Sequence, residues 1–293
     1  MPNHVAVVTG ASSGIGEATA QRLHGLDYVV YGLARRVDRM ADLAELGVRT
    51  LAVDVTDERA TAAAVEQIVA EQGRVDVLVN NAGYGSYGAL EDVPLSEARY
   101  QFEVNVFGLA RLIQLVLPHM RRQGRGRLIN ISSIGGKIYE PLGDWYHAAK
   151  FAVEGLSDSL RVELRPFGID VIIIEPGGIR TEWGAISAQK LRQASAGTAY
   201  QKQAETMAAV LESLGPLASP PSVVADTIAR AATARRPRTR YLTGRGARAA
   251  VTARQVLPDR AFDAVISSGY QMAGKWATRQ RHTATEPAPQ TPV

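Results

Sequence analysis

Short apolar, β-branched runs alternate with helical patterns along the first two-thirds of this 293-residue chain, and this alternation constrains the fold most. Near-continuous apolarity in each run indicates strands that are buried on both faces. Strands are expected at 5–10, 28–34, 49–55, 75–83, 126–133, 169–178 and 240–244. Helices are expected at Ile15–Leu23, Arg39–Leu46, Ala60–Glu71, Ser96–Met120 and Ala148–Arg165. The alternation predicts an α/β fold with a parallel sheet of about seven strands and helices on both faces.

The chain length suits one large α/β domain, which we expect to span residues 1–282. Residues 181–221 have no strand signal, and such an excursion inside a compact domain is often a lid, here expected to cover the substrate. A helical extension is expected at about 245–282. The last residues, 283–293, read "TATEPAPQTPV" and are expected to be disordered because they are rich in Pro and Thr.

The absence of cysteine excludes disulfides, thiolate nucleophiles and cysteine-based zinc sites, and we expect no metal site. The first residues, "MPNHVAVVTG", have too short an apolar run and no basic leader for a signal peptide. No stretch reaches the apolar length of a membrane span. We therefore expect a cytoplasmic protein without stable membrane insertion.

The net charge of +4 is distributed unevenly. The segment from Arg230 to Arg281 has twelve Lys/Arg residues and only two acids, Asp259 and Asp263. Such a segment could bind nucleic acid or an anionic membrane, but few aromatics are interleaved and no nucleic-acid motif accompanies it. We interpret it as a solvated face, or one that meets acidic patches of another subunit, and expect no nucleic-acid partner.

The stretch "TGASSGIG", Thr9–Gly16, lies between the first expected strand and the first expected helix. Its glycines allow a tight turn and close approach of a ligand, and the helix N-terminus offers free N–H groups to a pyrophosphate. The spacing is G-x-x-x-G-x-G rather than G-x-G-x-x-G, but the position is that of a dinucleotide-binding loop in a Rossmann-type doubly wound sheet. The candidate cofactor contacts are Gly10, Ser12, Ser13, Gly14, Ile15 and Gly16.

Two other glycine patterns compete with this interpretation. Gly83, Gly85 and Gly88 form a true G-x-G-x-x-G, but no helix starts at once, so a loop after the fourth strand is expected. Gly10, Ser12 and Gly14 match G-x-S-x-G, the nucleophile elbow of an α/β-hydrolase. Only one strand precedes Ser12, whereas such an elbow needs several, and no later histidine has a convincing partner acid. Hydrolysis through Ser12 is the competing hypothesis from a different class of enzyme.

The end of the second expected strand indicates which dinucleotide binds. An acid near this position, about 20 residues past the glycines, binds the ribose 2′-hydroxyl of NAD. Here the sequence reads "YGLARR", and Arg35 and Arg36 stand where the acid is expected. A guanidinium binds a 2′-phosphate by charge-assisted bonds. NADP(H) is therefore the expected cofactor, with Arg35 as the first candidate ligand because it comes first after the strand.

The stretch "WYHAAK" places Tyr146 four residues before Lys150, so both side chains lie on one helix face. A nearby ammonium lowers the pKa of a tyrosine, which makes the pair suitable for proton exchange. Ser132 and Ser133, in "INISSIGG", are expected at the carboxyl edge of the sheet, where a hydroxyl could hold a substrate carbonyl oxygen. No role is assigned to Trp145 or His147.

Together these motifs, in this order, resemble the short-chain dehydrogenase/reductase family, in its compact single-domain, NADP-preferring branch. The resemblance covers about Val5 to Gly244. The matching stretches are "TGASSGIG", "VDV" with Asp54, "NNAG" (Asn80–Gly83), "FEVNVFG" with Asn105, "ISS" with Ser133, Tyr146-x-x-x-Lys150 and "PGGIRT" (Pro176–Thr181).

The resemblance implies an oxidoreductase that transfers hydride between a nicotinamide and a carbonyl or secondary alcohol. Tyr146 would exchange the proton, Ser133 would orient the substrate oxygen, and Asn105 would hold a water in the proton relay. Lys150 would lower the pKa of the tyrosine and bind the nicotinamide ribose. Further cofactor contacts are implied at Asp54, Val55, Asn81, Ala82, Gly83, Tyr146, Lys150, Pro176, Gly177, Ile179 and Thr181. A homodimer or homotetramer is also implied.

The small-molecule substrate must be inferred from the expected lid. Its apolar positions indicate packing or a pocket for a fairly apolar ketone or aldehyde. They are Trp183, Ile186, Leu191, Met207, Leu211, Leu214 and Leu217. The C-terminal extension loosely resembles hydroxysteroid and retinol dehydrogenases, which suggests a steroid- or retinoid-like substrate. Two further functions stay open: an NADP-sensing regulator without turnover, and a sugar-nucleotide epimerase or dehydratase.

Overall fold

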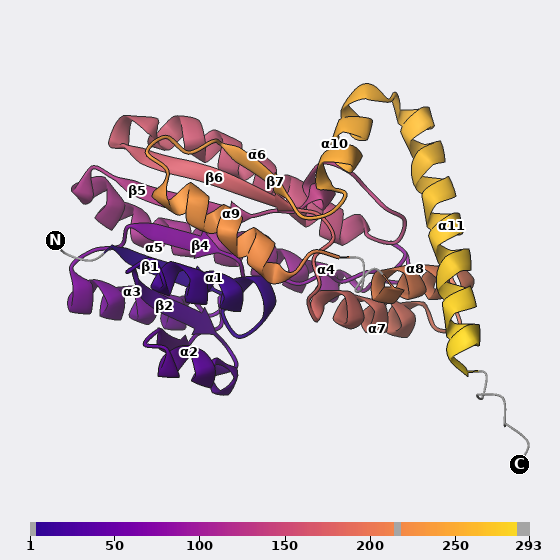
Figure 1. The fold of residues 1–293 in the computed structure, drawn as a ribbon, viewed down its shortest axis with the longest axis horizontal. Helices are drawn as coiled ribbons and strands as arrows, with labels where there is room; N and C mark the ends of the chain where they lie inside the picture. The colour runs from indigo at the N-terminus through magenta and orange to yellow at the C-terminus, as the bar shows by residue number, and fades with distance from the viewer. Residues whose placement is uncertain (1–3, 214–217, 286–293) are drawn as a thin grey trace, which may run out of the picture.

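Seven parallel strands form one sheet in the order β3-β2-β1-β4-β5-β6-β7 in the computed structural model (Figure 1). The structure describes residues 4–213 and 218–285, except for the side chains of 213 and 275–285. The expected α/β doubly wound fold is confirmed, and each expected strand is present with small changes at its ends. The strands are β1 Val5–Thr9, β2 Val29–Ala34, β3 Arg49–Ala52, β4 Val77–Asn80, β5 Gly126–Ile131, β6 Ile169–Pro176 and β7 Arg240–Thr243.

Alternate residues of the central strands pack into two different cores, one on each face of the sheet. Ala6 and Val8 of β1 belong to one core, and Val5 and Val7 belong to the other. Helices α1 (Gly14–His24), α2 (Ala41–Glu45) and α9 (Pro221–Thr233) contribute to the first core. Helices α3 (Glu58–Gln72), α5 (Gly108–Gln123) and α6 (Asp144–Leu164) contribute to the second. Burial on both faces explains why these strands read as continuous apolar runs.

Three expected helices differ from the structure in detail. The segment 39–46 forms a 3₁₀ turn, Val37–Met40, followed by the short α2. The segment 96–120 divides into α4 (Leu95–Phe102), a π-helical turn (Glu103–Phe107) and α5. Helix α6 begins at Asp144 rather than Ala148, because Gly143 and the acidic Asp144 form a favourable helix start. Tyr146 therefore lies in the first turn of α6.

Helices α7 (Trp183–Ser195) and α8 (Gln201–Ser213) fill most of the segment for which a lid was expected. Leu191, Met207 and Leu211 are buried in a third apolar cluster between these helices and the body, whereas Ile186 is exposed. Leu214 and Leu217 lie outside the described residues. Helices α10 (Ala247–Val256) and α11 (Asp259–Thr285) follow β7, and α11 lies alongside α8 (Figure 1). Helix α11 includes 283–285 of the segment expected to be disordered, and 286–293 lie outside the described residues.

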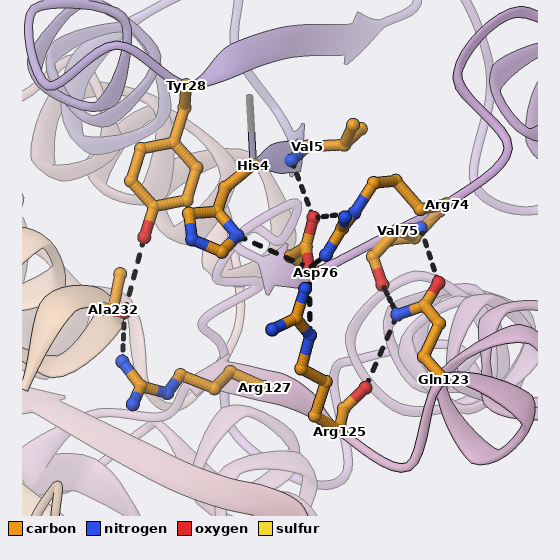
Figure 2. Close-up of polar contacts among 10 residues, drawn as sticks. All are labelled: His4, Val5, Tyr28, Arg74, Val75, Asp76, Gln123, Arg125, Arg127 and Ala232. Carbon is orange, nitrogen blue, oxygen red and sulfur yellow. Dashed lines mark hydrogen bonds and ion pairs between the residues drawn. The ribbon is translucent and has the colours of Figure 1, made fainter. Parts of the chain in front are cut away.

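A polar cluster fixes the amino-terminal edge of the sheet (Figure 2). The Asp76 carboxylate accepts hydrogen bonds from the backbone N–H of Val5 at 2.8 Å and from Nε of Arg74 at 2.8 Å. Arg127 at the same edge donates to the carbonyl oxygens of Ala231 and Ala232. This edge is opposite the one to which the candidate site residues were assigned, so we interpret the cluster as structural. Across the described residues, no helix combines the length and the apolar character required to span a bilayer.

Candidate active site

The loop between β1 and α1 depends on its glycines. Gly10 and Gly14 have φ values of +66° and +58°, which favour glycine. A Cβ on Gly16 would lie only 2.2 Å from the carbonyl oxygen of Gly10. Ser13 is the N-cap of α1 but makes no capping bond with its side chain. The first N–H groups of the helix therefore have no side-chain cap, which fits the pyrophosphate of a dinucleotide.

The "NNAG" stretch after β4 supports this loop from behind. Nδ2 of Asn81 donates to the carbonyl oxygen of Thr9 at 2.9 Å. The backbone N–H groups of Asn81 and Ala82 both donate to Oγ1 of Thr9 at 2.9 Å. Gly83 lies against Asn105, because a Cβ there would be 3.0 Å from the Asn105 Oδ1. The Asn81 side chain thus positions the glycine loop.

The arginines after β2 are available for a phosphate. The Arg35 side chain is 65% exposed and lies 3.9 Å from Oδ2 of Asp54. Its Nη1 donates to the hydroxyl of Tyr100 at 3.1 Å. Arg36 is also exposed. Asp54 itself accepts hydrogen bonds from the backbone and hydroxyl of Thr56 at 2.9 and 2.8 Å, which fixes its carboxylate next to Arg35.

An ion pair connects this arginine loop to the start of the lid helices. Arg39 donates to both carboxylate oxygens of Glu182, at 2.9 and 3.0 Å. This pairing lowers the pKa of the Glu182 carboxyl, and Arg36 contributes to the effect. The two residues are 143 positions apart in the sequence, so the sequence pattern could not predict this contact.

The segment after β6 completes the same side of the site. Pro176 ends the strand, and the N–H of Gly177 donates to Thr243 at 2.8 Å. Ile179 forms an isolated bridge with Ser219. A Cβ on Gly14 would lie 3.1 Å from the Thr181 side chain, so this segment lies directly against the glycine loop. Val55 lies shortly after the end of β3. Its carbonyl oxygen accepts a hydrogen bond from the Arg111 side chain at 2.7 Å.

Ser133, Tyr146 and Lys150 come together at the carboxyl edge of the sheet. Ser133 is near enough to Tyr146 to lower the pKa of its phenol. Nζ of Lys150 lies 6.0 Å from the centre of the Tyr146 ring and donates to the carbonyl oxygen of Ile131 at 3.0 Å. Both Tyr146 and Lys150 are buried, with exposures of 8% and 9%. The hydroxyl and the ammonium expected on one helix face therefore do lie together.

Burial dominates the electrostatics of this pair. It raises the pKa of Tyr146 to about 12, although the Ser133 hydrogen bond lowers it. Burial also lowers the pKa of Lys150 to about 8, and the Glu154 carboxylate opposes this shift. The expected lowering of the Tyr146 pKa by Lys150 is not seen, because desolvation of the phenol dominates. The raised pKa keeps the phenol protonated at neutral pH.

Asn105 lies in the π-helical turn between α4 and α5. Its Oδ1 accepts from the N–H of Tyr84 at 3.0 Å, and its Nδ2 donates to the carbonyl of Tyr84 at 2.8 Å. The side chain is 2% exposed. Turns of this kind are frequent at functional sites because they redirect a side chain without ending the helix. Asn105 thus holds the loop that carries Tyr84.

The His147 side chain forms two hydrogen bonds that the sequence did not predict. Its Nε2 accepts a hydrogen bond from the backbone N–H of Glu140 at 3.0 Å. Nδ1 must then carry the proton and donate to the carbonyl of Gly135, which is 2.9 Å away. The neutral imidazole, 5% exposed, ties α6 to the loop that connects Ser133 with Tyr146. Only side-chain geometry could have revealed this role.

Trp183, the first residue of α7, packs over the tyrosine. Its ring lies 5.1 Å from that of Tyr146 and 5.8 Å from that of Tyr87. A Cβ on Gly85 would lie 2.4 Å from the Trp183 indole. The competing G-x-G-x-x-G is thus a loop after β4, and its second glycine is required by packing against α7.

Hydrolysis through Ser12 has no support in this geometry. Ser12 lies in the glycine loop after the first strand, with only β1 before it. His147, the histidine next to Tyr146, has both ring nitrogens engaged by Gly135 and Glu140. The serine and this histidine therefore do not form a nucleophile and base pair.

Two cavities lie near β7 and near the lid helices. The larger, about 1100 Å³, is lined partly by Arg230, Arg238, Arg240 and Arg248 of the basic segment and includes none of the candidate site residues. The smaller, about 470 Å³, shares Ala89 and Leu142 with the apolar cluster that contains Tyr146. Of these two cavities, only the smaller shares residues with that cluster.

Comparison with known proteins agrees with this geometry. Residues 4–192 match the family described as short chain dehydrogenase. The chain is 46% identical over 182 residues to a 3-ketodihydrosphingosine reductase of Bacteroides thetaiotaomicron, an alignment that covers 62% of this chain and 66% of that relative. It is 34% identical over 271 residues to an NADPH-dependent 3-dehydrocapnine reductase of Ornithobacterium rhinotracheale, with coverage of 89% and 95%. A metagenomic short-chain oxidoreductase in complex with NADP has a TM-score of 0.66 at 31% identity, covering 82% of this chain and 96% of that one.

Proposed function

This chain belongs to the short-chain dehydrogenase/reductase family and is an oxidoreductase that acts on CH–OH and C=O groups with a nicotinamide cofactor; on that premise we propose that it uses NADPH to reduce the ketone of an apolar molecule. The observation that carries the proposal is the set formed by the buried Tyr146 and Lys150 with the half-buried Ser133. A hydrolase, a regulator without turnover and an epimerase are not supported.

Arg35 and Arg36 support NADPH over NADH. They stand at the end of β2, where an acid would repel a 2′-phosphate. The exposed Arg35 guanidinium can reach such a phosphate with charge-assisted bonds. The NADPH-dependent relative and the NADP complex of a similar structure favour the same cofactor.

NADPH, when bound, would supply the hydride. The residues of this chain would hold the carbonyl and supply the proton: Ser133 orients the oxygen and Tyr146 donates its phenolic proton as the carbon becomes CH–OH. The phenol is protonated at neutral pH, as a proton donor requires, although burial makes it a weaker acid. Lys150 retains most of its charge at pH 7, since its pKa of about 8 lies above that value.

The substrate is proposed to be a ketone on an apolar chain. Leu142, Leu191 and Met207 belong to the apolar cluster that contains Tyr146. Two relatives are named as reductases of 3-ketodihydrosphingosine and of 3-dehydrocapnine. A steroid or retinoid ketone is the second substrate class to test. We also propose that the chain forms a homodimer or homotetramer, acts in the cytoplasm, and forms one domain with a lid over the site.

A carbonyl panel tests this function directly. The protein would be mixed with NADPH and long-chain ketones, steroid ketones, retinal and small aldehydes, and NADPH absorbance would be followed. We expect oxidation with at least one long-chain ketone and slower oxidation with NADH. An absence of NADPH oxidation with every carbonyl, in protein that binds NADPH, would overturn the proposed reaction.

A further inference from the structure

The larger cavity, about 1100 Å³, is lined mainly by β7, the second half of α9 and one face of α10. The α10 residues in its lining are spaced three or four positions apart, so they share a face of the helix: Arg248, Val251, Thr252 and Gln255. Five basic side chains line the cavity, against two acidic ones. The lining contains none of the residues assigned to catalysis or to the cofactor, so its charges need a separate explanation.

Two of the five cations are paired with carboxylates. Nζ of Lys137 lies 2.7 Å from Oε2 of Glu154. Nε of Arg240 donates to the same oxygen at 3.1 Å, and its Nη2 donates to Oδ2 of Asp158 at 2.6 Å. Oε1 of Glu175 lies 3.5 Å from Nε of Arg240. Glu154 and Glu175 are 4% and 2% exposed, so this network forms a buried inner layer in which both cations already have partners.

The other three cations, Arg230, Arg238 and Arg248, have no such partner. All three are exposed, and across the side chains of 4–212 and 218–274 no ion pair joins any of them to a carboxylate. They line one cavity, so an anion that enters it relieves the repulsion between their like charges. Nη2 of Arg230 donates at 3.0 Å to Oγ1 of Thr227, a residue that is 2% exposed. This bond holds the Arg230 guanidinium against the buried part of the lining.

The segment between α9 and β7, which carries Arg238, is held by contacts that need no ligand. The Arg127 guanidinium donates to the carbonyl oxygen of Ala231 at 3.1 Å and to that of Ala234. The backbone N–H of Arg238 donates to the hydroxyl of Tyr241 at 3.0 Å. The backbone that carries this arginine is therefore fixed in advance, which lowers the entropic cost of binding a ligand.

We propose that this cavity is a second ligand site, which binds a soluble small molecule with two or more phosphate groups. A guanidinium forms charge-assisted, bidentate hydrogen bonds with a phosphate. Three guanidiniums without carboxylate partners suit several phosphates better than a single carboxylate, which would leave two of them without an anion. Thr252 and Gln255 offer further donors, and the volume accommodates a molecule of nucleotide size. This inference does not depend on the proposed ketone reduction.

The shape of the site favours a free small molecule over an extended anionic surface. Thr227 and Val251 line the cavity and are only 2% and 5% exposed, so the site is a recess with a buried base. A membrane surface or a nucleic-acid backbone would contact the exposed arginines but would not fill this recess.

Calorimetric titration of the protein with inorganic triphosphate, in the presence of saturating NADPH, tests the site. NADPH fills the proposed cofactor site, so triphosphate can bind only elsewhere. We expect one triphosphate per chain, with an affinity that falls as salt is added, and inorganic monophosphate should bind at least about 10-fold more weakly. The fluorescence of bound NADPH should not change, because the cavity and the cofactor site have no residue in common.

Substitution of the three arginines assigns the binding to this cavity. Arg230→Gln, Arg238→Gln and Arg248→Gln together should weaken triphosphate binding by about 100-fold or more, because glutamine keeps a polar side chain but removes the charge. Each single substitution should weaken it by about 3- to 10-fold.

A matched control removes three charges from the same basic segment without touching the cavity. Arg235, Arg236 and Arg260 are exposed and do not line it. Their combined replacement with glutamine lowers the net charge by the same amount and should leave the affinity for triphosphate within about threefold.

Failure of triphosphate to bind the folded protein would overturn the site, and so would displacement of NADPH by triphosphate. Equal weakening by the cavity and control substitutions would show attraction to net charge alone and would also overturn it. If the triple cavity variant does not fold, the single variants decide. Binding to vesicles that contain phosphatidylinositol bisphosphate, without binding of free triphosphate, would overturn the soluble ligand in favour of a membrane surface. Ketone turnover is not measured here, so a failed reduction leaves this site standing.

Discussion

Nδ1 of His147 lies 2.9 Å from the carbonyl oxygen of Gly135, and this bond holds the loop after Ser133 against the helix that carries Tyr146. The hydroxyls of Ser133 and Tyr146, which we propose to act on the substrate oxygen, come from different elements, so their separation depends on this contact. The same imidazole accepts a hydrogen bond from the backbone N–H of Glu140. The two bonds engage both ring nitrogens and require a neutral ring. His147 is thus a positioning residue for the pair.

Replacing His147 with leucine should lower kcat by about 10-fold or more, because small displacements of reacting groups are costly. NADPH affinity should remain within about threefold, since the glycine loop is on another element. Steady-state kinetics and NADPH fluorescence titration measure both quantities. His119→Leu on α5 is the control for loss of a partly buried histidine. An unchanged kcat in folded His147→Leu would contradict the positioning role.

Arg35→Ala should weaken NADPH binding by about 10-fold or more and leave NADH binding nearly unchanged, because only NADPH carries the 2′-phosphate. Titration of each dinucleotide against the variant measures this difference. Arg22→Ala on α1, whose side chain pairs with Asp226, is a control for loss of one positive charge. Equal losses for the two dinucleotides would show that Arg35 does not recognise the phosphate.

Asp76→Asn should lower the free energy of unfolding by about 2–3 kcal/mol at pH 7. Burial raises the pKa of Asp76, but hydrogen bonds from Arg74 and Val5 outweigh burial and hold the pKa below its usual value. A depressed pKa stabilises the fold above about pH 4 and loses that effect as the pH falls through the folded-state pKa. Urea unfolding of both proteins between pH 7 and pH 3 should therefore converge at low pH. A difference that does not change with pH would refute this assignment.

Glu175→Gln should stabilise the protein at pH 8. Burial, reinforced by the charge of Glu154, raises the pKa of Glu175 to about 7. The folded state then binds more protons than the unfolded state between about pH 4.5 and 7, so its stability falls as the pH rises through that range. Glutamine does not titrate, and the gain should grow to as much as about 3 kcal/mol above pH 7. Thermal unfolding of the variant and the parent protein across this pH range measures the gain in stability. A variant that is less stable than the parent at pH 8 would contradict the expected stabilisation.

The fold was predictable because the central strands are buried on both faces. The runs that became β1 and β6 have no polar face, and the glycine loop marks the first crossover, so the sheet and its carboxyl edge followed from pattern alone. Tyr146 and Lys150 were found because a four-residue spacing on a helix determines their relative position. Patterns within short stretches of the sequence were therefore sufficient to predict the sheet and the Tyr146–Lys150 pair.

Contacts between distant segments could not be predicted in this way. The Arg39–Glu182 ion pair and the packing of Gly85 against Trp183 join residues about a hundred or more positions apart. The direction of the Tyr146 pKa also escaped prediction, because it depends on burial and not on the neighbouring lysine alone. The His147 bonds depend on side-chain orientation, which residue type does not specify.

The most direct test of the account is NADPH oxidation by Tyr146→Phe in the presence of a ketone that the parent protein reduces. Phenylalanine preserves the ring that packs against Tyr87 and Trp183 but removes the proton donor. We expect kcat to fall by about 10²- to 10⁴-fold while NADPH binding changes little. A variant that oxidises NADPH at the parental rate would contradict the assignment of Tyr146 as the proton donor.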